Sequence, residues 1–290
     1  MKAYIKIVVS LLVSVWFLGS CTETNTVISS NQKPVVEAFL APGKPISLTL
    51  MTVIGYSESA DASDSVAKPI DGQTIKVKVS DGSVFTLQSV GQGVYTSKST
   101  EVVKFGLTYT LDFTYNGLPV SAITEIPTRP TGFKLSKNFV NRTQINLSSG
   151  TGGFGGPGGF QEDRTPIVAT WDNPKGEYHF LAFINTEANP ESIVILPTDT
   201  TGTNPFRFIN RRFNNEPTTA LTTDVQPQSF QYFGKHYAVL YRLNPDYAAL
   251  YKSAGTTTQN ISTPPTAITN GLGIFTGVNA DTLIFTVYRN

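Results

Sequence analysis

Short segments of alternating polarity, separated by turn signals, constrain the fold of this chain more than any other feature. In residues 46–50, 75–79 and 107–114, apolar side chains alternate with polar ones, which is the period of a strand with one buried and one wet face. Asp81-Gly82 and Asn116-Gly117 are hairpin signals beside such segments. Only 15% of the residues are charged, whereas Gly, Pro and Phe are frequent. We therefore predict a mainly β protein.

The alternating pattern is interrupted once in a way that predicts a domain boundary. About six or seven strands fit between residues 34 and 127, as in an immunoglobulin-like or fibronectin-like sandwich. Pro127, Pro130 and Gly132 then break the pattern. The sequence thus predicts an immunoglobulin-like β-sandwich at 34–127 and a second domain at 128–290.

The second domain is predicted to be mostly β with one short helix. The segments with strand patterns are 167–171, 178–184, 192–196, 206–209, 237–243 and 283–289. The helix follows Asn244-Pro245, which supply a cap and a first-turn proline, and Gly255 ends it. Tyr247, Leu250 and Tyr251 share one face of that helix.

A glycine-rich stretch interrupts the second domain. Residues 148–161 contain seven glycines and one proline, so this stretch cannot offset its ordering entropy by packing. We expect a mobile loop at 149–160 that is a candidate contact loop. A phosphate-binding loop is not favoured, because the stretch lacks the lysine of such loops and their strand-to-helix setting.

The start of the chain has the layout of a secretory signal peptide at 1–20. Lys2 and Lys6 precede an apolar run from Ile7 to Leu18, which is shorter than the roughly 20 residues that span a bilayer. The tetrad Leu18 to Cys21 resembles the bacterial lipobox, whose cysteine receives lipid. Cys21 is the single cysteine of the chain, so it cannot form an internal disulfide. We expect acyl chains such as palmitate on Cys21 and a polar tether at 21–33.

The residue after this cysteine predicts the membrane in which the chain resides. The net charge predicts which class of partner is not expected. Thr22 stands where lipoproteins of the inner membrane commonly carry aspartate, which favours the outer membrane, on either its surface or its periplasmic face. Removing Lys2 and Lys6 from the 22 basic residues leaves 20 against 21 acidic ones. Nucleic acid is not an expected partner, because its binders display a basic stripe.

Several motifs along the mature chain resemble those of a Bacteroidota lipoprotein family called domain of unknown function 4249. They are the stretches at 34–40, 42–43, 93–95, 106–109, 124–127, 171–174, 247–251 and 268–275. The resemblance implies an outer-membrane lipoprotein, often encoded beside a TonB-dependent transporter, with no established activity. It also implies an outer-membrane barrel protein as a partner.

Three tripeptides resemble the sequence that Bacteroidota glycosylate on a hydroxyl after export. They place candidate O-glycosylation at Ser65, Thr200 and Thr282. The modification needs a site at the surface. Ser65, in a polar loop, is the best candidate, whereas residues 281–283 also read as a plain strand start.

Catalytic and metal chemistry finds little support in the sequence. The only histidines, His179 and His236, lack a nucleophile elbow or metal-ligand spacing. His179 lies on the face opposite Tyr178 and Phe180 and is expected to be solvated, and His236 reads as a strand start. No catalytic residue, metal or cofactor is therefore assigned.

Two alternatives to a non-enzymatic binding or accessory subunit stay open. Aromatic side chains beside arginines suit protein or glycan contacts, so a contact surface is predicted at Phe206, Arg207, Phe208, Arg211 and Arg212. A glycan-binding module is one alternative. A carboxylate-based glycosidase-like enzyme is the other, with Glu162, Asp163, Asp172 and Glu177 as its nearest acidic cluster.

Overall fold

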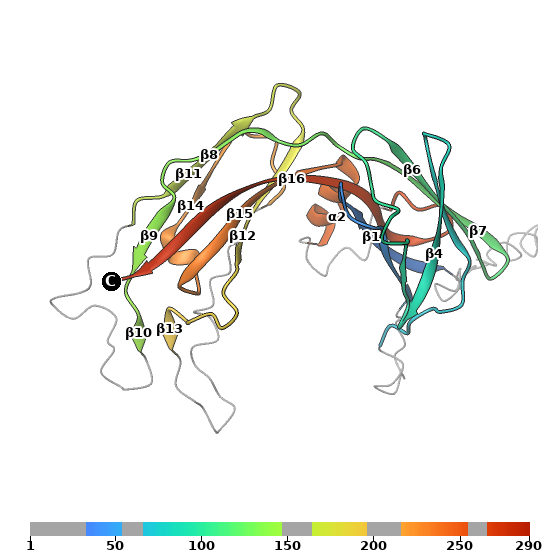
Figure 1. Cartoon of the computed structure of the whole chain (residues 1–290), viewed down its shortest axis with the longest axis horizontal. Coiled ribbons are helices and arrows are strands. Elements are labelled where there is room, and N and C mark those ends of the chain that lie inside the picture. The colour runs from blue at the N-terminus through green and yellow to red at the C-terminus, as the bar shows by residue number, and fades with distance from the viewer. Residues whose placement is uncertain (1–32, 54–65, 147–163, 196–215, 255–265) are drawn as a thin grey trace, which may run out of the picture.

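A computed structural model of the chain describes residues 33–53, 66–146, 164–195, 216–254 and 266–290 (Figure 1). The described part is mainly β, which confirms the predicted fold class. The strands are β1 (Pro34–Leu40), β2 (Ser47–Thr52), β3 (Ile75–Val79), β4 (Val84–Gly91), β5 (Val94–Thr96), β6 (Thr108–Tyr115), β7 (Leu118–Glu125), β8 (Thr131–Leu135), β9 (Phe139–Arg142), β10 (Ile145–Asn146), β11 (Ile167–Asp172), β12 (Tyr178–Asn185), β13 (Val194–Ile195), β14 (Thr222–Val225), β15 (Gly234–Leu243) and β16 (Leu272–Arg289). The helices are the short 3-10 helix η3 (Pro227–Ser229) and α2 (Pro245–Ala254).

The first seven strands surround one apolar core. They are hydrogen-bonded in the order β1-β2-β5-β4-β3-β6-β7, and alternate residues of each strand point into the core, as the sequence predicts. Strand β3 shows this plainly, because Ile75, Val77 and Val79 are buried while the two lysines between them are exposed. Both predicted hairpins are present, and Gly82 and Gly117 adopt the positive φ that their turns require.

The second half of the described chain is a sandwich of two sheets. One sheet has the order β12-β15-β16-β9, and the other has the order β14-β11-β8. The side chains between the two sheets form a second core of mostly apolar residues, including Ile167, Leu240 and Phe285. Strands β8, β9, β10 and β14 are additions that the sequence pattern does not predict.

Strand β16 joins the two cores. Its first part pairs in parallel with β1, from Leu272 to Gly277, and its second part pairs antiparallel with β15, from Val278 to Val287. Phe275 accordingly packs in the first core and Phe285 in the second. Figure 1 shows this strand running from one half of the molecule to the other. The C-terminal segment therefore belongs to both halves of the fold.

Residues far apart in sequence close the first core. Ser121 of β7 forms a β-bridge with Thr269, just before β16, and Gly277 donates its backbone N–H to Thr124 Oγ1 at 2.8 Å. Ile268 packs in the same core. Strands β7 and β1 thus flank the start of β16, and the first core is completed by residues from the end of the chain.

The predicted helix is confirmed as α2, and it lies against the outer side of the sheet near the junction of the two halves. Tyr247 contacts Phe39 of β1 edge-on, with ring centroids 5.5 Å apart. Tyr251 packs on Phe180 of β12, with ring centroids 6.1 Å apart. The helix therefore covers part of the sheet face that points away from the second core.

Candidate functional site

An exposed apolar row crosses the outer face of the sheet β12-β15-β16-β9. Ile184 of β12 stands opposite Tyr237 of β15, which stands opposite Ile284 of β16. Residues opposite one another in paired strands share a face, so the three side chains form a continuous line. Tyr288 lies four residues beyond Ile284 on the same face, and its ring lies 5.7 Å from that of Phe139 on β9.

We call these five side chains, Phe139, Ile184, Tyr237, Ile284 and Tyr288, the outer row. Their exposed fractions lie between 46% and 66%. Large apolar side chains gathered on one exposed face mark an interaction surface more often than single ones do. The outer row is therefore a candidate interaction surface.

The inner face of the same sheet holds the outer row in place. Phe285, next to Ile284, is fully buried. Its ring lies 5.2 Å from those of Phe183 and Phe230, stacked on the latter. Because side chains of a strand alternate between faces, this packing fixes which residues of β16 point outward.

Polar side chains hold the end of β7 and the segment that follows it against the second half. The amide nitrogen of Asn244 donates to Thr124 Oγ1 and to the Glu125 carbonyl, and Asn279 donates to the Pro127 carbonyl at 2.9 Å. Arg129 pairs with Asp281 at 2.5 Å. These bonds hold the connection between the two cores along β15 and β16.

A buried polar cluster lies at the end of the second core that faces this connection. His179 of β12 stands opposite Arg242 of β15, and its ring lies 5.6 Å from that of Trp171 on β11. Arg242 donates to Thr128 Oγ1 and pairs with Glu177 at 3.3 Å. The cluster therefore spans both sheets of the sandwich and reaches the connecting segment.

The expectation that His179 is solvated is wrong. Its side chain is fully buried, although it lies opposite Tyr178 and Phe180 as the alternation predicted. The reason is that the second sheet covers this face of β12. His236 is also buried, and it is the third residue of β15, near the start of that strand as predicted. It is hydrogen-bonded, since Nδ1 lies 3.0 Å from the Gly234 carbonyl and Nε2 lies 3.3 Å from Asn185 Nδ2.

Burial lowers the pKa of both histidines below the ordinary value of 6.5, because the charged ring loses its hydration. For His179, the Glu177 carbonyl and carboxylate oppose this shift, whereas nearby Arg242 adds to it. For His236, the Gly234 carbonyl and Glu187 oppose it. Both rings are therefore neutral in the folded protein at neutral pH.

We predict that the free energy of unfolding falls as the pH drops below about 6.5. The unfolded chain then binds protons that the folded chain resists, so stability is full above 6.5 and is lost toward the lowered pKa values. Each histidine contributes a slope of up to about 1.4 kcal/mol per pH unit. Urea unfolding between pH 5 and 7.5 measures this slope, and His179→Phe should reduce it. An unchanged slope in that variant would show that His179 does not contribute to the pH dependence of stability.

Of the other predicted site residues, only Thr282, Glu177 and Asp172 lie within the described part of the chain. Thr282 is exposed, on the same side of β16 as Ile284, and lies inside β16 rather than at a strand start. Glu177 pairs with Arg242, whereas Asp172 is exposed on β11 beside Gly132. The remaining predicted residues, Cys21, Ser65, Glu162, Asp163, Thr200, Phe206, Arg207, Phe208, Arg211 and Arg212, and the loop 149–160, lie outside the described residues.

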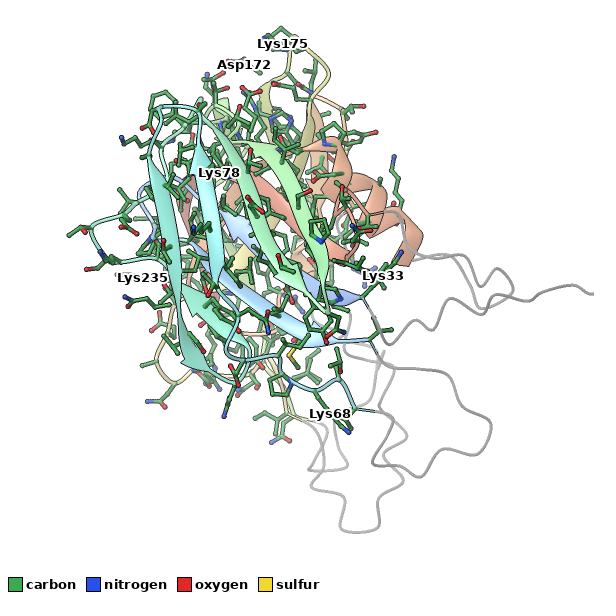
Figure 2. The ribbon with its side chains drawn as sticks, turned by 90° about the vertical axis from the view of Figure 1, so that its right-hand side faces the viewer. Lys33, Lys68, Lys78, Asp172, Lys175 and Lys235 are labelled. Carbon is green, nitrogen blue, oxygen red and sulfur yellow. The ribbon has the colours of Figure 1, made fainter. Side chains whose placement is uncertain are left out.

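The exposed charges of the described chain are spread over the molecule. Figure 2 shows Lys68, Lys78, Lys175 and Lys235 on different sides. Among the described residues, no group of three or more His, Cys, Asp and Glu side chains is placed to hold a metal ion. Within the same residues, no helix has both the length and the apolar character needed to cross a membrane.

Fold and surface together define a mainly β protein of two cores that share one long strand and carry an exposed apolar sheet face. The family model described as Domain of unknown function (DUF4249) matches residues 22–284. The chain belongs to this family, which confirms the resemblance inferred from its motifs. Among curated proteins, none matches the chain.

Proposed function

We propose that this protein is a lipid-anchored outer-membrane lipoprotein that serves as a non-enzymatic binding or accessory subunit of an envelope complex, such as a TonB-dependent transporter. The observation that carries the proposal is the outer row, a set of exposed apolar side chains on a rigid sheet. The signal-peptide layout and Cys21 support the membrane anchor, since two or more acyl chains hold a protein stably on a bilayer.

The sheet is suited to present such a surface. The outer row extends over four hydrogen-bonded strands, and the aromatic packing of Phe285, Phe183 and Phe230 lies directly beneath it. Interfaces are enriched in aromatic residues, and the outer row contains Tyr237, Tyr288 and Phe139. The backbone of a hydrogen-bonded strand is already ordered, so binding at this face costs little further backbone entropy.

The test is a gentle detergent pull-down from the native outer membrane, with Cys21 intact and mass spectrometry of the co-purifying chains. Wild-type protein should recover a stoichiometric barrel protein. Ile284→Glu should lower that recovery at least about tenfold, equivalent to about 1.4 kcal/mol, because a charge at the centre of the row cannot be buried unpaired.

The matched control is Ile123→Glu on β7, an isoleucine with 63% exposure on the first half of the molecule. It should leave recovery unchanged. Cys21→Ser should move the protein out of the membrane fraction. If Ile284→Glu recovers as much barrel protein as the wild type, the outer row is not the contact surface. If the wild-type protein is recovered without any partner, the proposed accessory role is wrong.

Glycan binding is the second candidate, because the tyrosine rings of the outer row lie exposed on one face. Stacking of a sugar on an aromatic ring needs such a platform. Purified mature protein should then bind a glycan array, and Tyr237→Ala should abolish that binding while Ile123→Glu does not. Binding that survives Tyr237→Ala would rule out Tyr237 as the stacking platform, and binding that also survives Tyr288→Ala would rule out this face.

A further inference from the structure

Three buried polar atoms at the end of the second core have no hydrogen-bond partner: Trp171 Nε1, His179 Nε2 and Arg242 Nε. They are the only such buried side-chain atoms within the described residues. The exposed fractions of the three residues are 4%, 0% and 7%. Buried polar groups in native proteins are almost always hydrogen-bonded, and one left unsatisfied is destabilising, so three such atoms in one cluster call for a partner.

The three residues are neighbours that come from both sheets of the sandwich. Trp171 reaches the cluster from β11, and its ring lies 5.6 Å from that of His179. His179 and Arg242 occupy directly opposed positions on β12 and β15, which places their Cβ atoms roughly 4.5–5.5 Å apart. The three side chains therefore meet in one region between the two sheets.

The donor or acceptor character of each of the three atoms restricts which ligand can satisfy them. His179 Nδ1 lies 3.1 Å from the Glu177 carbonyl, which only accepts, so Nδ1 carries the proton and Nε2 of the neutral ring accepts. Trp171 Nε1 and Arg242 Nε are donors. The ligand must accept from two N–H groups and donate to a ring nitrogen. A halide or carboxylate cannot donate, and an ammonium ion cannot accept.

We propose that Trp171, His179 and Arg242 form a binding site for one internal water molecule. Water both donates and accepts, and a buried water typically makes about three hydrogen bonds to groups of this kind. Such a water links β11 to β12 and β15. It also positions the guanidinium of Arg242, which contacts Thr128 and Glu177. The site therefore stabilises the arrangement by which the second core holds the connection to the first.

The experiment uses the single tryptophan of the mature chain. The sequence contains two tryptophans, Trp16 in the signal peptide and Trp171, so the mature, detergent-solubilised protein gives one indole N–H signal by NMR. We expect a nuclear Overhauser effect between this N–H and a long-lived water. A crystal structure should show the same water within about 2.7–3.2 Å of the three nitrogens.

His179→Phe removes the acceptor and keeps a ring in the core, so the signal from bound water should be lost. His236→Phe is the matched control, because it alters the other buried histidine, at the far end of β15, and it should leave the signal intact. A direct bond between Trp171 Nε1 and His179 Nε2 without water, or no such signal in the wild type, would overturn the proposal. Persistence of the signal in His179→Phe would overturn it as well.

Discussion

Phe285→Ala is expected to lower the free energy of unfolding by about 3–5 kcal/mol, which is the cost of truncating a buried phenylalanine. Phe285 is fully buried. The centroid of its ring lies 5.2 Å from the ring centroids of Phe183 and Phe230. Truncation removes both aromatic contacts and leaves a cavity between the sheets. Urea unfolding of residues 21–290 at pH 7.5, followed by the fluorescence of Trp171, measures the loss.

Ile284→Ala is the control for this prediction, because it changes the adjacent residue on the exposed side of β16. A surface substitution of this kind shifts stability by no more than about 0.5 kcal/mol. The two variants together test the register of β16, since a slip by one residue exchanges the buried and exposed sides of a strand. A larger loss for Ile284→Ala than for Phe285→Ala would mean that the outer row faces the core.

The strands of the first half could be predicted because one face of each strand is buried and the other is wet. Strand β3 has the predicted bounds, and the hairpins after Val79 and Tyr115 follow from Asp81-Gly82 and Asn116-Gly117. In these segments the alternation and the turn residues agree. Local sequence preference and tertiary packing therefore lead to the same structure.

Strand β16 was only partly predicted, for residues 283–289, because glycines interrupt its first part. Gly271, Gly273 and Gly277 read as breakers in a strand pattern. In the structure they permit close approach: a Cβ on Gly277 would lie 2.4 Å from the Glu125 carbonyl oxygen. Some glycines allow two backbones to approach closely, and others end a strand. A single sequence does not distinguish these two roles.

The candidate site depends on pairing between distant segments, so the sequence could not reveal it. Ile184, Tyr237 and Ile284 each read as ordinary strand residues, and only the register of β12, β15 and β16 aligns them. Arg242 was missed for a related reason. It continues the inward-facing series of His236, Ala238 and Leu240, and that two-residue period was the one available signal of its burial.

Gly273→Ala is expected to lower the free energy of unfolding by about 2–5 kcal/mol, through strain and a clash together. Gly273 has a φ of +92°, which side chains rarely adopt, and an added Cβ would lie 2.1 Å from the Val36 carbonyl oxygen. Because Gly273 pairs with Val36, relief of the clash must separate β16 from β1. Urea unfolding measures the loss.

The matched control is Gly91→Ala, since Gly91 has the same φ of +92° and an added Cβ there meets no atom within 4 Å. It carries only the strain of the positive φ, about 1–3 kcal/mol, and the difference between the two variants is the cost of separating β1 from β16. Equal losses of unfolding free energy would mean that β16 can move away from β1 without destabilising the protein. The pairing of β16 with β1 would then not stabilise the first core. A larger loss for Gly273→Ala would show that the parallel pairing with β1 holds the C-terminal strand, and through it the outer row, to the rest of the protein.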